Sequence, residues 1–257
     1  MKIKKALLCA LALTVLPAAH SFAGEREAAA AAAIGALVRG ELSPERIEVT
    51  VANDGKRAWI ECAGAVISGI RIESMKLDAE LAELPDDVLS GDGTALSRRI
   101  TSSRGEIVLS ERDVNDYFAS GKSSGGFSEL RFKFFPRGYH AEGKFEADLM
   151  IIKIKLDLRA EGKLGLRADG VYLEDTVIYA EGRKQPENIT ELVIGRVNPL
   201  LPFAKIPFPV SFSRMTMKNG EALLTGEPKK SLETMFGDGS ADIQADISRI
   251  KDKKRGC

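Results

Sequence analysis

Histidine, cysteine and tryptophan are scarce in this chain of 257 residues, which has two histidines, three cysteines and one tryptophan. A zinc site needs several histidine or cysteine ligands, and a histidine-based triad needs a histidine beside its nucleophile. His140 is the only histidine after residue 23, and it falls on the polar side of an alternating run. We therefore expect no metal, no cofactor and no enzymatic activity.

The chain also lacks an excess of charge, with 37 basic and 37 acidic residues. Nucleic-acid-binding modules usually carry a clear basic excess, so we expect no nucleic-acid partner. After residue 23 there is no run of about 18 apolar residues, which is the length that a membrane-spanning helix requires. The sequence therefore predicts a protein that is soluble or bound to a membrane surface.

Residues 1–23 have the features of a signal peptide. Met1–Lys5 is basic, Ala6–Ala18 is apolar, and Ser21–Ala23 is a small-x-small cleavage site. We expect an exported protein that is periplasmic or extracellular, in the cell envelope. In such an oxidising compartment Cys62 and Cys257 could form a disulfide; the alternative is a buried Cys62 and a free terminal thiol.

The most informative segment is Phe127–Gly182, where apolar and polar residues alternate over several runs separated by glycines. A period of two predicts antiparallel strands with one apolar and one polar face. Such a face must be covered by protein, by lipid or by both. The apolar positions include Leu130, Phe132, Phe134, Tyr139, Ala141, Phe145, Ile152, Ile154, Leu156 and Leu158.

Hairpins are predicted at two turns. Asn53–Gly55 separates two alternating runs, and Asn219-Gly220 separates two more. Both dipeptides, Asp-Gly and Asn-Gly, are typical of type I′ turns. Between these hairpins, Ala65–Leu84 alternates with one slip and predicts a single bulged strand.

Helical spacing of apolar residues appears in three segments: Glu25–Val38, Pro186–Val197 and a segment that begins after Ser110 and ends near Ser120. Ser110 is a good N-cap for the last of these. Pro85–Ser103 has no clear period and predicts a loop or a short helix.

These elements predict an α+β fold in which a curved antiparallel sheet wraps around one or two helices. We expect one domain over residues 24–227, because folds rich in strands often reach this size as a single unit. Residues 228–257 are polar and predict a C-terminal tail.

Leu200–Val210 contains three prolines and many apolar residues, which favour an extended, irregular path. One interpretation is that its side chains close one end of the sheet. The other is that it forms a lip that contacts a membrane or an acyl chain, with Lys205 available to a lipid phosphate.

Four segments, Ser68–Leu77, Leu109–Tyr117, Asn198–Leu201 and Asn219–Gly226, resemble the LmeA-like phospholipid-binding family of exported bacterial proteins, formerly a family of unknown function. The resemblance extends from about Glu25 to Glu227. It implies a curved sheet around helices, similar to tubular lipid-binding folds, and binding of anionic phospholipids in the cell envelope. It implies no catalytic residue.

The leading hypothesis is therefore a non-catalytic exported protein that holds a phospholipid or its acyl chains against the apolar face of a bent sheet. The main alternative is a structural or interaction protein of the envelope with a fully packed core, and a weaker one is a carboxylate-based hydrolase. The expected partner is a phospholipid or a membrane surface. Candidate lipid-binding residues are Phe132, Phe134, Phe145, Ile152, Ile154, Leu156, Leu192, Leu200, Leu201, Phe203, Lys205, Ile206 and Phe208.

Overall fold

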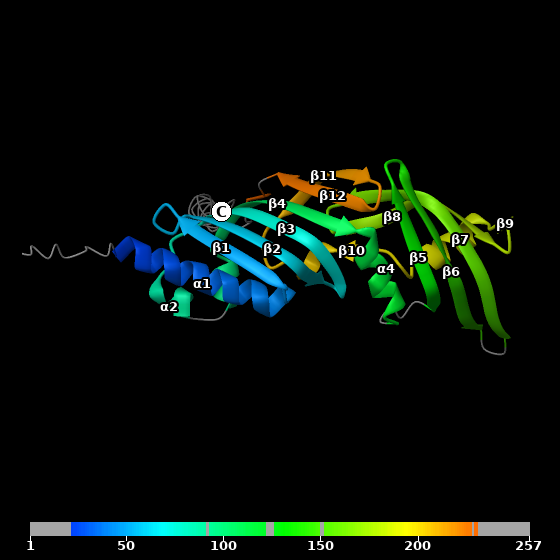
Figure 1. Ribbon diagram of the computed structural model, residues 1–257, viewed down its shortest axis with the longest axis horizontal. Coiled ribbons are helices and arrows are strands. Elements are labelled where there is room, and N and C mark those ends of the chain that lie inside the picture. The colour runs from blue at the N-terminus through cyan, green and yellow to red at the C-terminus, as the bar shows by residue number, and fades with distance from the viewer. Residues whose placement is uncertain (1–21, 91–92, 122–125, 150–151, 228, 231–257) are drawn as a thin grey trace, which may run out of the picture.

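The computed structural model describes residues 22–90, 93–121, 126–149, 152–227 and 229–230, which form two antiparallel sheets placed end to end (Figure 1). The first sheet contains β1 (Arg46–Ala52), β2 (Arg57–Ile67), β3 (Ile70–Leu81), β4 (Ile100–Ser110), β11 (Ser211–Lys218), β12 (Glu221–Glu227) and β13 (Lys229–Lys230). The second contains β5 (Phe127–Phe135), β6 (Gly138–Leu149), β7 (Ile152–Arg167), β8 (Gly170–Ala180), β9 (Arg183–Lys184) and β10 (Leu201–Pro202). The helices are α1 (Phe22–Leu42), α2 (Asp86–Ser90), α3 (Gly93–Ser97), α4 (Glu111–Ala119), α5 (Glu187–Ile194) and the short 3-10 helix η1 (Phe203–Lys205).

The strand order is β1-β2-β3-β4-β12-β11 in the first sheet, with β13 paired to β4. In the second sheet it is β10-β8-β7-β6-β5, with β9 paired to β8. The α+β class is thus confirmed, and the curved antiparallel strands are divided between two open sheets rather than forming one. The signal peptide and the polar tail predicted from the sequence lie outside the described residues, apart from residues 22–23 and 229–230.

Both predicted hairpins are present. Asn53, Asp54 and Gly55 all have positive φ angles, of 57°, 55° and 83°, in the turn between β1 and β2. At the second hairpin Lys218 pairs with Glu221, but only the glycine of Asn219-Gly220 has a positive φ, so this turn is not of type I′.

The single strand predicted over Ala65–Leu84 is wrong, because the chain reverses at Ser68 and Gly69 to form a third hairpin. Their φ angles are 51° and 90°, so a serine occupies a position that usually takes asparagine, aspartate or glycine. The reversal pairs Ile67 with Ile70 and buries both side chains. The apolar alternation therefore continues through the turn, which is why the sequence pattern predicts one strand instead of two.

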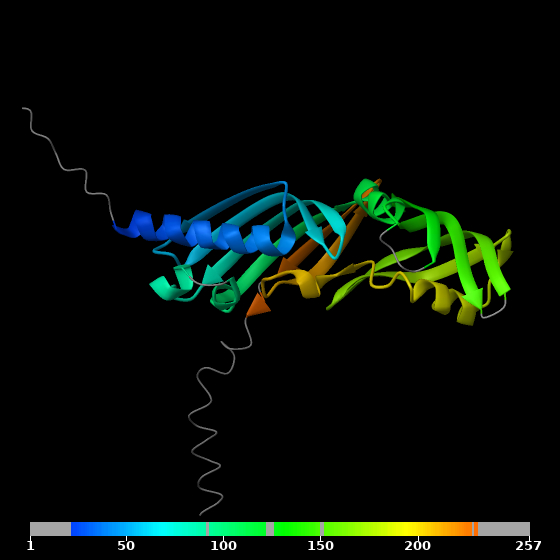
Figure 2. The ribbon, with the colours of Figure 1, turned by 90° about the horizontal axis from the view of Figure 1, so that it is seen from below.

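The helices lie where the sequence predicts them, but their lengths differ from the prediction. α1 is longer than predicted and buries Ile34, Val38 and Leu42 against the first sheet. α2 and α3 are two short helices in the segment where a loop or a short helix is predicted, and they lie beside α1 (Figure 2). α4 begins after Ser110, whose Oγ accepts a hydrogen bond from the Asp113 backbone N–H at 3.1 Å, so this cap is confirmed.

α4 explains why β4 and β5 do not join one sheet. Two of its side chains occupy the free edge of β5 in place of a neighbouring strand. Glu111 Oε2 accepts from the Phe134 N–H at 2.7 Å, and the Asn115 amide accepts from the Phe132 N–H at 2.6 Å and donates to the Phe132 carbonyl at 3.0 Å. The edge is thereby blocked against pairing with another strand.

The other side of α4 is fixed to the first sheet through the buried carboxylate of Asp113. Arg71 Nη1 donates to both of its oxygens, at 3.0 and 3.1 Å, and Ser110 Oγ donates at 2.7 Å. Arg71 also donates to Glu45, and this bond is the main cause of the raised pKa of the guanidinium. α4 is therefore a fixed link between the two sheets.

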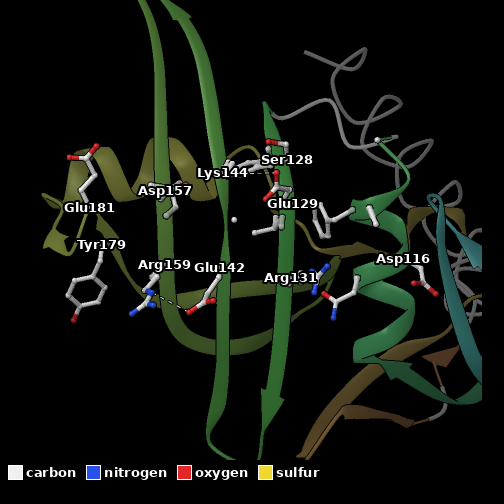
Figure 3. Close-up of a pocket in the computed structure, with 18 of the residues that line it drawn as sticks. Asp116, Ser128, Glu129, Arg131, Glu142, Lys144, Asp157, Arg159, Tyr179 and Glu181 are labelled. Carbon is white, nitrogen blue, oxygen red and sulfur yellow. Dashed lines mark hydrogen bonds and ion pairs between the residues drawn. The ribbon is translucent and has the colours of Figure 1, made fainter.

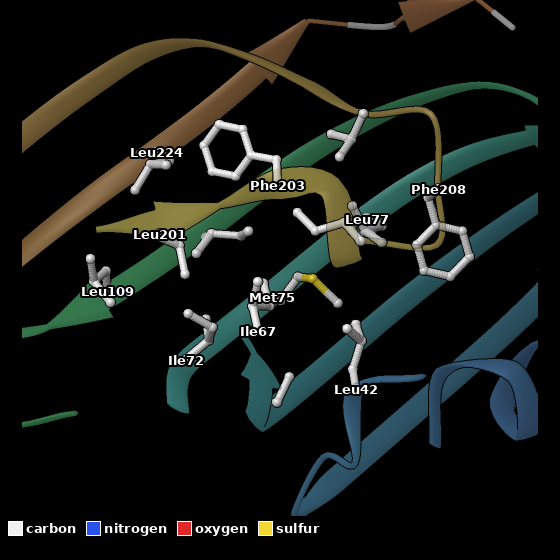
Figure 4. Close-up of a cluster of buried hydrophobic side chains, with 14 of the residues drawn as sticks. Leu42, Ile67, Ile72, Met75, Leu77, Leu109, Leu201, Phe203, Phe208 and Leu224 are labelled. Carbon is white, nitrogen blue, oxygen red and sulfur yellow. The ribbon is translucent and has the colours of Figure 1, made fainter. Parts of the chain in front are cut away.

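The main core lies on the covered face of the first sheet and continues onto the second sheet through residues such as Phe132, Phe134 and Tyr139. On the first sheet α1 and the proline segment, defined as Leu200–Val210, pack against β2, β3, β4 and β12 (Figure 4). The apolar side chains at the centre include Leu42, Ile67, Ile72, Met75, Leu77, Leu109, Leu201, Phe203, Phe208 and Leu224.

Candidate functional site

A small apolar cavity lies between the second sheet and α5. Its volume is about 30 Å³, roughly the share of one water molecule in the liquid, so the cavity as it stands has no room for an acyl chain. The lining is formed by carbon-rich side chains and one glycine. These residues are Phe127, Leu130, Phe132, Tyr139, Ala141, Gly143, Leu158, Ala160, Leu173, Ile178, Val193, Ile194 and Val197.

Small residues hollow the middle of this sheet face. Ala141 of β6 and Ala160 of β7 are direct cross-strand partners, and each also faces a large residue on its other side, Phe132 and Ile178 respectively. Because side chains directly opposite each other in neighbouring strands are in contact, two adjacent alanines leave a shallow depression between the larger neighbours. Gly143 adds to it two residues further along β6.

α5 covers this depression loosely. Val193 is its only buried side chain, while Ile194 is half-buried. Ile189 and Leu192 face outward and are 38% and 58% exposed. An eight-residue helix is too short to be stable alone in water, so α5 depends on these few contacts with the sheet.

The structure divides the predicted lipid-binding residues among several places. Phe132 lines the cavity, and Phe134 is buried beside it in the main core. Phe145 and Leu156 belong to a second apolar cluster with Val193 of α5. Leu192 is exposed and does not line the cavity, and the side chains of Ile152 and Ile154 lie outside the described residues.

The proline segment is not at this cavity. Its large apolar side chains are buried in the main core, and Ala204 and Lys205 are exposed. This placement agrees with the interpretation that the segment closes one end of a sheet, and it leaves no exposed apolar lip there. The buried residues of the predicted set are Leu200, Leu201, Phe203, Ile206 and Phe208.

Sequence reasoning did not select the small residues of the cavity, Ala141, Gly143 and Ala160, because it searched for large apolar side chains. The signal that could have found them is the presence of alanine and glycine on the apolar phase of two consecutive strands. Tyr139 was also not selected. It is almost fully buried, its hydroxyl lies 2.7 Å from Thr176 Oγ1, and burial raises its pKa to about 12.

A polar groove of about 990 Å³ lies on the opposite face of the second sheet, with α4 as one wall (Figure 3). Its charges are arranged in cross-strand pairs. Lys144 Nζ lies 2.6 Å from Glu129 Oε1, and Arg159 Nε lies 3.2 Å from Glu142 Oε1. The hydrogen bond to Glu129 raises the pKa of Lys144, because it stabilises the ammonium.

Catalytic and metal sites are not apparent within the described ranges. No group of three or more histidine, cysteine, aspartate or glutamate side chains there could hold a metal ion. His140 is exposed, with its ring 4.9 Å from that of Phe135. Among the helices described, none is long and apolar enough to cross a membrane.

Residues 121–125 spell Gly-x-Ser-x-Gly, a pattern that sequence reasoning overlooked. A hydrolase nucleophile elbow requires this pattern between a strand and a following helix. Here the order is reversed, since the segment follows α4 and precedes β5, and residues 122–125 lie outside the described part of the chain. The pattern therefore does not indicate a hydrolase.

Cys62 is buried, which raises the pKa of its thiol to about 11. A thiol with so high a pKa is a poor nucleophile at neutral pH. Cys257, its predicted partner, lies outside the described residues, and the disulfide stays a prediction.

The fold and the cavity together define an α+β protein in which an antiparallel sheet shelters a wholly apolar space beneath a short helix. The family can be stated more narrowly. Residues 27–227 match the LmeA-like phospholipid-binding family, and the chain belongs to that family, as the sequence resemblance predicts. Searches among curated proteins and among solved structures found no match.

Proposed function

We propose that this protein is an exported, non-catalytic lipid carrier or lipid sensor of the cell envelope, which holds the acyl chains of a phospholipid between the second sheet and α5. The observation that carries the proposal is the apolar cavity beneath a loosely held helix. Membership of a phospholipid-binding family supports the nature of the ligand. Residues 1–23 support export, because they have the composition of a signal peptide.

Binding requires α5 to move outward, since the cavity is too small for an acyl chain. Exposing a fully buried valine such as Val193 costs about 1.5–3 kcal/mol. Each methylene that enters the apolar space contributes about 0.8 kcal/mol. A segment of about two to four methylenes therefore offsets the exposure of Val193, and a longer one gives net binding.

The alternative is a structural or interaction protein whose core is complete without a ligand. The observation that favours it is the size of the cavity, together with the filled main core. The two functions differ in what the purified protein carries, because only a lipid-binding protein retains phospholipid through purification.

The test is native mass spectrometry of the mature protein, purified from a cell extract that contains membranes. The lipid-bound fraction of the wild type is compared with that of two variants. Ala160→Leu fills the floor of the cavity and should reduce the lipid-bound fraction about tenfold. Ala204→Leu is the matched control, because it makes the same change at an exposed position of the proline segment. Wild-type protein without bound lipid and without affinity for phospholipid vesicles would favour the packed alternative.

A further inference from the structure

Few large apolar side chains are exposed in the described part of the chain, and two of them lie together on α5. The exposed residues are Trp59, Val66, Ile189 and Leu192. Trp59 and Val66 are far apart along β2 of the first sheet, whereas Ile189 and Leu192 are three positions apart on a helix of eight residues. Residues three apart on a helix are neighbours on one side, so α5 presents a joined apolar surface to solvent.

This exposed pair continues the apolar surface that covers the cavity. Val193 follows Ile189 by four positions and is therefore its neighbour on the helix, and Val193 is the side chain of α5 that is buried against the sheet. The apolar stripe of α5 is thus wider than the face that it buries. One edge of the stripe lines the cavity, and the other edge, formed by Ile189 and Leu192, faces solvent.

The charges of α5 and of the turn after it lie on different sides. Glu187 and Glu191 are roughly opposite the exposed apolar pair, because a helix has about 3.6 residues per turn. Arg196 follows Leu192 by four positions in a turn that continues the helix, where its N–H donates to a carbonyl of α5 at 3.2 Å. Its exposed guanidinium lies 5.3 Å from the centre of the Phe145 ring. The apolar pair therefore adjoins a cation and is directed away from the two carboxylates.

This arrangement suits the interfacial region of a lipid bilayer. An amphipathic helix lies in that region with its apolar side chains at the acyl boundary, and cations beside it are attracted to anionic lipids. Figure 2 shows α5 at the end of the molecule far from α1, where a flat surface can reach it. A lipid surface thus complements both the apolar pair and the cation next to it.

We propose that α5 docks on a phospholipid bilayer through Ile189, Leu192 and Arg196, and that lipid enters the cavity while the helix is docked. This inference rests on the proposed function. In water, movement of α5 away from the sheet exposes Val193 to solvent, whereas at a bilayer the same side chain passes into an apolar environment. The bilayer therefore lowers the free energy of opening at the place where lipid is available.

The experiment measures vesicle binding and lipid loading separately. The full mature protein, freed of lipid, is mixed with vesicles of phosphatidylethanolamine and phosphatidylglycerol. Co-sedimentation gives the vesicle affinity, and native mass spectrometry gives the rate and the final extent of loading.

The test variant is Ile189→Gln with Leu192→Gln, in which glutamine retains a good helix propensity. We expect the vesicle affinity and the loading rate to fall about tenfold, because two aliphatic side chains no longer enter the bilayer. The final bound fraction should match the wild type, because neither residue lines the cavity.

Trp59→Gln with Val66→Gln is the matched control, because it removes the other two exposed large apolar side chains, which lie on the first sheet. This variant should bind vesicles and load lipid as the wild type does. An equal loss in both double variants would show that general surface hydrophobicity, rather than α5, drives vesicle binding.

The remaining outcomes separate the docking surface from the proposed function. Wild-type affinity and loading rate in the α5 variant would overturn docking through α5 and leave the proposed function intact. Vesicle binding that depends on α5 without any loading of lipid would overturn the proposed function instead. A wild-type dimer that dissociates in the α5 variant, with vesicle binding unchanged, would assign this surface to a second copy of the chain and overturn the bilayer as its partner.

Discussion

The two sheets have similar strands and very different covers. On the first sheet three helices and the proline segment fill the apolar face, and residues such as Ile60, Ile72 and Ile107 are fully buried (Figure 2, Figure 4). On the second sheet Phe118 of α4 packs against Phe132, and the part of the apolar face beyond it is covered by α5, which buries one side chain of its own. The same apolar alternation therefore occurs in strands with a firm protein cover and in strands with a loose one.

The difference shows where a ligand can bind. Displacing the cover of the first sheet exposes many large side chains at once, whereas displacing α5 exposes few. Exposing the apolar face of the first sheet therefore costs more free energy than lipid binding can return, whereas displacing α5 costs little enough for lipid to replace it. The binding surface of an amphipathic sheet is the part whose protein cover is least stable.

The largest effect that separates the two regions is expected from Phe203→Ala in the proline segment. Phe203 is buried in the main core with its ring 4.8 Å from that of Phe212, so its loss should lower the free energy of unfolding by about 3–5 kcal/mol. Urea denaturation measures this change. A loss below about 1 kcal/mol would mean that the proline segment is as loosely held as α5.

Val193→Ala is the companion variant on α5. It removes two methyl groups from the one buried position of the helix. We expect the free energy of unfolding to fall by about 1 kcal/mol, because α5 can move toward the sheet and fill the space. If both variants cost the same free energy, the contrast between a firm and a loose cover is wrong.

An alkaline pH titration compares one buried acid from each region. Burial raises the pKa of Cys62, in the first sheet, from 9.0 to about 11, and that of Tyr139, in the second, from 10.0 to about 12. Each neutral group favours the folded state, so its contribution is complete below its unfolded pKa and is lost as the pH rises to its folded pKa. Because each pKa rises by about 2, each contribution is about 3 kcal/mol.

Unfolding curves at pH 8, 10 and 11.5 measure this loss in the wild type, in Cys62→Ala and in Tyr139→Phe. Between pH 9 and 11 the loss should shrink in the cysteine variant, and between pH 10 and 12 in the tyrosine variant. Equal losses in all three proteins would show that neither group is held in its neutral form by burial.

Much of the fold could be predicted from the sequence because its signals are local. Period-two alternation located the strands of the second sheet, Ser110 located the start of α4, and Asn53–Gly55 located a hairpin. The hairpin at Ser68 was missed because serine rarely takes the left-handed conformation, and only the pairing of β2 with β3 makes it do so.

The division into two sheets and the place of the site depend on contacts between distant segments. Asn115 blocks the edge of β5 from 17 residues away, and the proline segment enters the main core across more than a hundred residues of sequence, where Ser103 Oγ donates to the Pro209 carbonyl. No local pattern marks either contact. The alanines of the cavity were visible in the sequence, but only the register of β6 with β7 makes Ala141 and Ala160 neighbours.

The smallest expected effect concerns Leu192, which the sequence places in the pocket wall and the structure leaves 58% exposed on α5. Leu192→Ser should change the free energy of unfolding by less than about 0.5 kcal/mol, because an exposed side chain contributes little to packing. The lipid-bound fraction should also match the wild type, whereas Ala160→Leu on the floor of the cavity lowers it. Urea denaturation and native mass spectrometry of the same samples check both points. A large loss of bound lipid in Leu192→Ser alone would show that the outward face of α5, rather than the cavity beneath it, contacts the lipid.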